Sequence, residues 1–412
     1  MECKWAAAAT TPVDHPTERV AVLDPPPGLR ALAERAPISR LRFSDGRAGW
    51  LVTSHALART LMVDNRFRVD PVTLPLGDPE MLAEVDRIEQ STPESQGVLI
   101  MLHPPQHTRI RRAAAKYFTV RAVHEQEQAI ERIVADRLDA IEAAGGPIDL
   151  VTEFALPVSS FSICQQLGVS PADRERFEQP SAILADPHLD AEQKRAALVS
   201  FYDYCRQVVA EKRAAPQADI LSDLVQQGEL SEDEIVGLAR QLFEAGHETT
   251  ASQLSLGVIA LLADRSRWEA LRADPSLVGN AVEELLRYLS ILQLGSFART
   301  ADEDVDLGDV VIRKGETVVV SIPVVNRDPE KFPDPEQLDL GRNAAGHLAF
   351  GHGRHMCIGQ HLARLELKLA LRGLLERFPT LDLAVPLEQI RFFGGEHQMY
   401  GVESLPVTWR ER

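Results

Sequence analysis

The sequence predicts a mainly α fold with a helical bulk and a smaller β-rich lobe. Apolar residues recur with the period of an α-helix over three long stretches, 120–144, 196–214 and 231–263. Strand-like alternation is confined to short segments such as 38–43 and 317–322. At 412 residues the chain exceeds a single ordinary core, so we expect two domains or one large fold.

Composition is that of an ordinary globular enzyme, with 44% apolar and 25% charged residues. The formal net charge of −17 argues against a general nucleic-acid-binding surface, which needs a dominant basic face. The scattered cysteines, Cys3, Cys164, Cys205 and Cys357, form no disulfide framework or CxxC site and suit a reducing cytoplasm. No segment approaches the ~20 apolar residues of a membrane span, so we expect a cytoplasmic protein without a membrane partner.

The N-terminal elements follow in a clear order. We expect residues 1–27 to be a flexible lead that ends in a run of prolines, followed by a short helix. A β-hairpin is predicted over 38–52, and Ser54 should cap a helix over 55–63. The following segment, 70–95, is rich in Pro, Asp and Glu without periodicity, as in mobile or functional connections.

Further helices are expected over 103–118, 120–144, 148–169, 171–180, 196–214, 231–263 and 281–287. Ser231 and Glu234 form a capping box that marks one helix start, and the Gly-Gly-Pro sequence at 145–147 stops another. Near the C-terminus, Lys314 and Gly315 predict the turn of a hairpin between 310–312 and 317–322.

A glycine-punctuated loop at 350–359 delivers one cysteine to the start of an amphipathic helix. Gly351 and Gly353 permit backbone conformations that a side chain would block. Because a helix N-terminus favours an anion, we expect the pKa of the Cys357 thiol to be lowered.

These residues leave four roles open for Cys357: a structural cysteine, a zinc ligand, a nucleophile or an axial ligand of haem iron. Zinc is suggested by His347, His352, His355 and His361 nearby, but zinc sites usually need several thiolates at short spacing. A nucleophile needs a base and an orienting group, and no such signature is near. The haem-thiolate role accounts best for the small residues.

The loop resembles the haem-binding loop of soluble bacterial cytochromes P450. The residues that fall on the family pattern are Phe350, Gly351, Gly353, His355, Cys357 and Gly359. The resemblance implies that Cys357 is the proximal ligand to the iron of haem b, and that Gly359 lets the next helix lie close to the porphyrin. It also implies a single large domain of the P450 fold over residues 28–412.

A basic run in the predicted 103–118 helix opposes the helix dipole, which indicates a purpose. His107 and Arg111 are four residues apart and share one face. They resemble the family's pair that holds the haem propionates, and Arg299 and His355 resemble its other propionate ligands. His103 stands where the family commonly has aspartate, a departure that concerns the helix cap.

The middle of the 231–263 helix carries an acid beside an alcohol, Glu248 and Thr249. Glycine costs ~1 kcal/mol in a helix interior, and threonine hydroxyls can bond back to carbonyls and bend a helix. The segment resembles the acid–alcohol pair of P450 monooxygenases, in which Thr249 would stabilise iron-bound oxygen and Glu248 would link it to a proton supply. We expect Thr249 to matter more than Thr250, because it follows the acid directly, and His247 to be structural.

Glu284 and Arg287 match the ExxR motif of the family's K-helix. An exposed ion pair of this spacing is worth only a few tenths of a kcal/mol. The resemblance implies a buried pair, closed by Arg342 and needed for haem incorporation. The Asn-Arg-Asp-Pro sequence at 326–329 completes the family's order of motifs.

By resemblance, the substrate pocket involves the 75–100 loop, the helix around 242–248, the stretch 291–297 and residues 392–394. The expected lining residues are Leu242, Ala245, Gly246, Leu294, Phe297 and Phe393. They are largely apolar, so we expect a hydrophobic substrate. Family members of this Ala-Gly-x-Glu-Thr form often tailor polyketides, macrolides or terpenoids in actinomycete secondary metabolism, including antibiotic biosynthesis.

The predicted function is a haem-thiolate monooxygenase that inserts one oxygen atom from O2 into a hydrophobic small molecule, by hydroxylation or epoxidation. Electrons would come from NAD(P)H through a ferredoxin reductase and a ferredoxin, which would meet Arg109, Arg112 and Arg364. The alternatives are haem-thiolate proteins without monooxygenation, namely a peroxygenase, a gas sensor or an electron carrier, and a zinc-bound regulatory protein. The Glu248–Thr249 pair favours oxygen activation.

Overall fold

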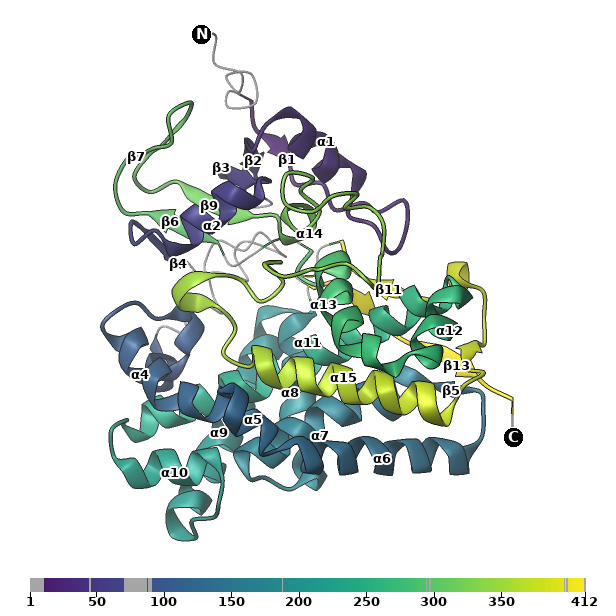
Figure 1. The fold of residues 1–412 in the computed structure, drawn as a ribbon. Helices are drawn as coiled ribbons and strands as arrows, with labels where there is room; N and C mark the ends of the chain where they lie inside the picture. Colours follow the sequence, from purple (N-terminus) through teal and green to yellow (C-terminus); the bar gives the residue numbers. More distant parts are fainter. Residues whose placement is uncertain are drawn as a thin grey trace.

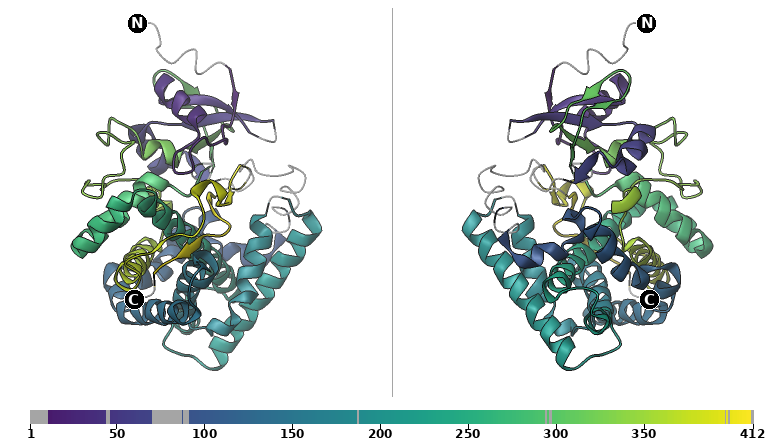
Figure 2. Two further views of the ribbon diagram at one scale, coloured as in Figure 1. Left: turned by 90° about the vertical axis from the view of Figure 1, so that its right-hand side faces the viewer. Right: turned by 90° about the vertical axis from the view of Figure 1, so that its left-hand side faces the viewer.

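A β-rich lobe lies against a larger helical body (Figures 1 and 2). The computed structural model describes residues 11–410 except 44–45, 70–86, 88–90, 187, 294, 296–297, 396 and 398. The expected mainly α fold with small β lobes is confirmed.

The α-helices are α1 (Pro27–Arg35), α2 (His55–Val63), α4 (Gln106–Ala115), α5 (Val120–His124), α6 (Glu127–Ala144), α7 (Leu156–Leu167), α8 (Glu175–Ala185), α9 (Ala191–Ala214), α10 (Ile220–Gln227), α11 (Glu232–Leu262), α12 (Arg265–Ala273), α13 (Val278–Leu289), α14 (Ile322–Val325) and α15 (Gln360–Arg377). The strands are β1 (Val13–Asp14), β2 (Ile38–Arg42), β3 (Ala48–Val52), β4 (Phe67–Val69), β5 (Ile148–Asp149), β6 (Arg299–Ala301), β7 (Val305–Asp306), β8 (Val311–Ile312), β9 (Thr317–Val320), β10 (Asp382–Leu383), β11 (Phe392–Phe393), β12 (Gly401–Val402) and β13 (Pro406–Thr408).

The main sheet of the lobe has the strand order β1-β2-β3-β9-β6-β4. Its β2–β3 hairpin is the one expected from the sequence, and β3 continues the sheet by parallel pairing with β9. The 310–322 hairpin prediction is wrong: β8 pairs with β7, whereas β9 pairs with β3 and β6. The residues flanking Gly315 enter different sheets because β9 pairs with the distant strand β3, while β8 forms a nearer hairpin with β7.

The helical body is built around α11, which runs for 31 residues. Ser231 and Glu234 form the expected capping box at its start. The helix is buried along most of its length and packs against α7, α9 and α15. It therefore crosses the core in contact with α15, the helix that follows Cys357.

Several predicted boundaries differ from the structure, among them the two that follow. The helix expected from 196 begins earlier, because Asp190 and Gln193 make a capping box before α9. Ile148 and Asp149, expected in a helix, form β5 and pair with β13, and a π-helical turn at Val151–Ala155 precedes α7. A two-residue strand carries too little alternation to be recognised locally.

A tight glycine contact fixes the segment before α4 to α11. A Cβ on Gly237 would lie 1.9 Å from the carbonyl oxygen of Glu94, in the 3-10 turn η2 (Pro93–Gly97). The Glu94 carboxylate also accepts a 2.5 Å hydrogen bond from Nε of Arg206 on α9. The segment that follows residues 70–90 is thus bound to both α9 and α11.

The N-terminal segment contacts the end of α13 through Arg327, whose side chain is 2% exposed. Its Nη2 donates to the Leu23 carbonyl at 2.8 Å and to the Tyr288 carbonyl at 3.0 Å. Its Nη1 donates to the Asp24 carboxylate at 2.8 Å. Within the described ranges, no helix has the length and apolar character to cross a membrane.

Candidate active site

The cysteine loop lies between α2 and α15 and depends on two left-handed glycines. Gly351 and Gly353 have φ of 71° and 76°, and a Cβ on Gly353 would come within 2.8 Å of the Met62 carbonyl oxygen on α2. The backbone N–H of Cys357 donates to the Phe350 carbonyl at 2.8 Å. These contacts hold the sulfur at the start of α15.

Opposing effects act on the pKa of the Cys357 thiol. Burial raises the pKa of the thiol, although a hydrogen bond from the Gly359 N–H and the charges of Arg111 and Arg364 act to lower it. The helix start and the arginines therefore offset only part of the burial effect. Cys357 would hold haem iron as the thiolate, because metals deprotonate the thiols that coordinate them.

Three of the predicted propionate ligands bring unpartnered nitrogen atoms into the interior. They are Nε2 of His107, Nε of Arg299 and Nδ1 of His355, each buried without a hydrogen-bond partner among the described residues. The rings of His107 and His355 lie 4.4 Å apart. Burial is the main reason why their pKa values fall, to about 4 for His107, about 3 for His355 and about 10 for Arg299.

The fourth predicted ligand, Arg111, lies against the cysteine loop, where its Nη2 donates to the Met356 carbonyl at 2.6 Å. Buried nitrogen donors without carboxylate partners are suited to anionic oxygens. The haem group carries two carboxylates beside a ring whose iron takes a thiolate ligand. The basic cluster and Cys357 therefore fit haem.

On α11, the predicted acid–alcohol pair faces two different environments. Thr249 Oγ1 donates to the Ala245 carbonyl at 2.8 Å, the backward bond expected from the sequence, and α11 remains α-helical throughout. Ala245 is exposed although it lies in the middle of a buried helix. Burial, with Glu244 second, raises the pKa of Glu248 to about 7.

The neighbours of this pair are structural. His247 is 3% exposed, with Nδ1 2.8 Å from the Phe243 carbonyl, in agreement with the role expected for it. A Cβ on Gly246 would come within 2.9 Å of Ile163 on α7, so this glycine permits close helix packing as well as any pocket contact.

A buried acid that the sequence reasoning missed lies next to the pair. Glu366 on α15 is 2% exposed, and the side chains of Ser162 and Thr250 act to lower the pKa of its carboxyl group. Burial raises its pKa well above the usual value. It occupies the same face as Leu362 and Leu369, so a charged residue on an apolar helix face was the available signal.

The predicted pocket residues are only partly described. Ala245 is exposed, Leu242 is 6% exposed, and Phe393 on β11 lies 5.7 Å from the His397 ring. Leu294 and Phe297 lie outside the described residues, as does most of the 75–90 part of the expected loop.

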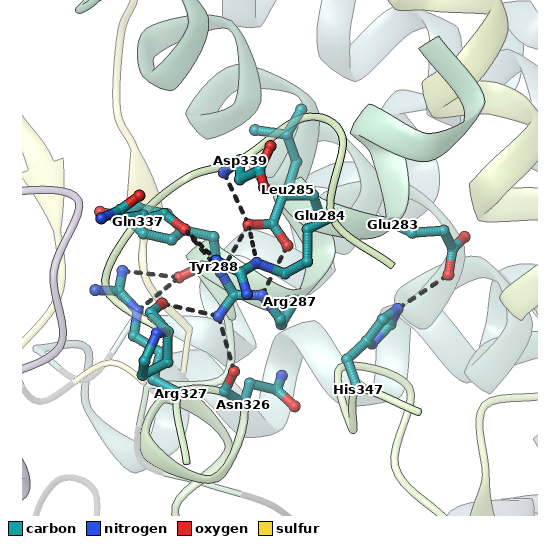
Figure 3. A network of polar contacts seen from close by, with 12 residues as sticks. Glu283, Glu284, Leu285, Arg287, Tyr288, Asn326, Arg327, Gln337, Asp339 and His347 are labelled. Atoms are coloured by element: carbon teal, nitrogen blue, oxygen red, sulfur yellow. Dashed lines mark hydrogen bonds and ion pairs between the residues drawn. The ribbon is translucent and has the colours of Figure 1, made fainter. Parts of the chain in front are cut away.

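The ExxR residues form a buried cluster of the expected kind (Figure 3). Nε and Nη2 of Arg287 each donate to the Glu284 carboxylate at 2.7 Å, and both side chains are 0% exposed. Nε of Arg342 donates to the same carboxylate at 3.1 Å. Arg287 also donates to the carbonyls of Asn326, Pro335 and Gln337, which joins α13 to the segment before the cysteine loop.

Of the arginines expected to meet a ferredoxin, two have internal carboxylate partners. Arg109 pairs with Glu234 in the α11 capping box, with one contact of 2.9 Å, and Arg364 pairs with Glu283 on α13. Arg112 is exposed.

Comparison with known proteins agrees with this geometry. A family model described as Cytochrome P450 matches residues 177–389. Cytochrome P450 105C1 of a Streptomyces species is 40% identical over 399 residues, which cover 97% of this chain and 99% of the relative. The chain belongs to the cytochrome P450 family.

Other P450s match over almost the whole chain. Pentalenic acid synthase of Streptomyces avermitilis is 39% identical over 407 residues, or 98% of each protein. The structure of mycinamicin VIII C21 methyl hydroxylase from Micromonospora griseorubida, bound to mycinamicin VIII, has a TM-score of 0.88 and 36% identity, covering 96% of this chain and 100% of that one.

The bacterial P450 resemblance expected from the cysteine loop is thus confirmed, and the protein is a monooxygenase with a haem-thiolate cofactor. Bacterial P450s generally receive their electrons from redox partners. The zinc alternative is wrong: the family match excludes it, and the described residues contain no group of three metal-ligating side chains.

Proposed function

We propose that this P450 binds haem b through Cys357 and oxygenates a hydrophobic natural product of the polyketide, macrolide or terpenoid class in the cytoplasm. The supporting observation is the unpartnered nitrogens of His107, Arg299 and His355 on a fold that carries Cys357 at a helix start. Arg111 completes the basic group around the two haem carboxylates. Phe350, Gly351 and Gly359 shape the loop around the sulfur.

When bound, the haem iron supplies O2 activation, so that one oxygen atom enters the substrate and the other leaves as water. Glu248 serves as the proton reservoir, because a pKa of about 7 lets its carboxyl group both release and accept a proton near neutral pH. The Thr249 hydroxyl lies on the same helix face as the exposed Ala245. From this position the hydroxyl group passes the proton on. Glu284, Arg287 and Arg342 keep the loop in place.

The substrate class follows from the apolar residues expected to line the pocket, among them Leu242, Ala245 and Phe393. Relatives are named for making pentalenic acid and for hydroxylating mycinamicin VIII. Leu294 and Phe297 remain part of the proposed lining, and Gly246 contributes by letting α11 lie close to α7.

Electrons reach the haem from a ferredoxin and its NAD(P)H-dependent reductase. Arg112 is the proposed contact with the ferredoxin whose positive charge is not compensated by a carboxylate of the described residues. The charge of Arg109 is compensated by Glu234, and that of Arg364 by Glu283. Arg112→Glu should therefore slow reduction by the ferredoxin more than Arg109→Glu, with the difference shrinking at high salt.

The test is the optical spectrum of the purified ferric protein during titration with macrolides, polyketide fragments, steroids and terpenes. A thiolate-type Soret band that shifts from low to high spin with one compound class supports both the cofactor and that class. A protein without a Soret band after haem is supplied would refute the proposal.

A further inference from the structure

A second carboxylate cluster lies beside the ExxR cluster and involves the residue before Glu284 (Figure 3). Glu283 Oε1 accepts from Arg364 Nε at 2.6 Å, and Oε2 lies 3.2 Å from Arg364 Nη2. Nε2 of His347, which is 9% exposed, lies 3.1 Å from the same Oε2. Glu283 thus joins α13 to α15 and to the segment before the cysteine loop.

The arginine of this cluster acts directly on the cysteine loop. The Arg364 guanidinium carbon lies 4.4 Å from the centroid of the Phe350 ring. The Phe350 carbonyl accepts the Cys357 N–H at 2.8 Å. A contiguous path of contacts therefore leads from the Glu283 carboxylate to the backbone of the sulfur-bearing residue.

Arg364 also brings a positive charge near the sulfur, because it lies on α15 seven residues after Cys357 and against the Phe350 ring. Among the described residues, Arg111 has only the Met356 carbonyl as a hydrogen-bond partner. Arg364, in contrast, forms an ion pair with the Glu283 carboxylate, which compensates its charge. Hydrogen bonds from His347 and Arg364 overcome the effect of burial and lower the pKa of Glu283 to about 2, so it is ionised at neutral pH.

We propose that Glu283 is a positioning residue that sets the reduction potential of the haem-thiolate centre, by holding Arg364 against Phe350 and by cancelling part of its charge at the Cys357 sulfur. The inference rests on the proposed haem-thiolate function. Reduction adds an electron beside the thiolate, so a positive charge nearby favours the reduced state. Loss of Glu283 should raise the potential, and loss of the Arg364 charge should lower it.

The experiment is a redox titration of the haem-loaded wild-type, Glu283→Gln, Arg364→Gln and doubly substituted proteins. We expect Glu283→Gln to raise the ratio of reduced to oxidised protein up to about tenfold at a fixed potential, which is about 59 mV for a one-electron couple. Arg364→Gln should change the ratio in the opposite direction, and the double variant should return close to wild type. Glu376→Gln is the matched control, because Glu376 pairs with the exposed Arg372 at 2.7 Å on the same helix, α15.

A purely structural role predicts a different pattern. Both single variants would then shift the potential in the same direction and convert the ferrous carbonyl spectrum from the thiolate-ligated to the neutral-thiol form, which would overturn the proposal. If Glu283→Gln fails to fold, Arg364→Lys and Arg364→Gln decide: only the loss of charge should lower the potential. A wild-type protein without a thiolate-type Soret band refutes the proposed function itself, whereas a normal wild-type spectrum with unshifted variants refutes only this inference.

Discussion

Replacing Glu284 by Gln should destabilise the protein far more than replacing an exposed glutamate of the same spacing. Glu284 and Arg287 are both 0% exposed, and the Glu284 carboxylate receives hydrogen bonds from Arg287 and Arg342. Removing one partner of a buried ion pair costs about 3–5 kcal/mol, because the other charge stays buried without compensation.

The size of the expected shift follows from the length of the chain. At about 2.1 cal/mol/K per residue, 412 residues give an unfolding entropy of about 0.9 kcal/mol/K. A loss of about 3–5 kcal/mol therefore lowers Tm by about 3–6 °C. Thermal unfolding followed by far-UV circular dichroism measures the shift.

The control is Glu269→Gln on α12, because Glu269 makes an exposed i,i+3 pair with Arg272 at 2.5 Å. Exposed pairs contribute about 0–1 kcal/mol, so Tm should change by about 1 °C or less. Equal shifts in the two variants would show that burial of the Glu284–Arg287 pair adds nothing to stability.

Three further outcomes are expected. Thr249→Ala should uncouple NAD(P)H consumption from product formation in the reconstituted system, and Thr249→Ser, which keeps the hydroxyl, should not; equal coupling in both would exclude a role for the hydroxyl. Because burial and then Glu244 raise the pKa of Glu248 from 4.5 to about 7, the native state keeps this proton where the unfolded chain has lost it. The free energy of unfolding should therefore fall as pH rises through this window, and Glu248→Gln should remove that fall in urea titrations. Gly237→Ala should lower the free energy of unfolding by about 1–3 kcal/mol or more, since its Cβ would lie 1.9 Å from a backbone oxygen. Gly257→Ala, whose Cβ would have its nearest atom at 3.4 Å, should raise it by about 1 kcal/mol through helix propensity. Similar urea midpoints for the two variants would contradict this packing argument.

Local signals in the sequence predict local structure well. The Ser231–Glu234 capping box and the Ser54 cap mark true helix starts, because the groups that satisfy each other lie within one turn. The hairpin predicted around Gly315 does not form, because β9 pairs with β3, far away in the chain, and β8 pairs with the preceding strand β7.

The site shows the same division. Cys357, His107 and Arg299 could be proposed as site residues because each stands in a recognisable motif. The Glu283–His347 contact could not, because 64 positions separate the two residues and neither carries a local signal.

The contact between Arg327 and the N-terminal segment determines where the chain can be shortened. Leu23 and Asp24 supply a carbonyl and a carboxylate to a guanidinium whose side chain is 2% exposed. Expression variants that begin before residue 23 keep both partners. A variant trimmed to the first helix at Pro27 would leave donors of a nearly buried cation unpaired, so the useful limit for truncation or for joining a redox partner lies upstream of Leu23.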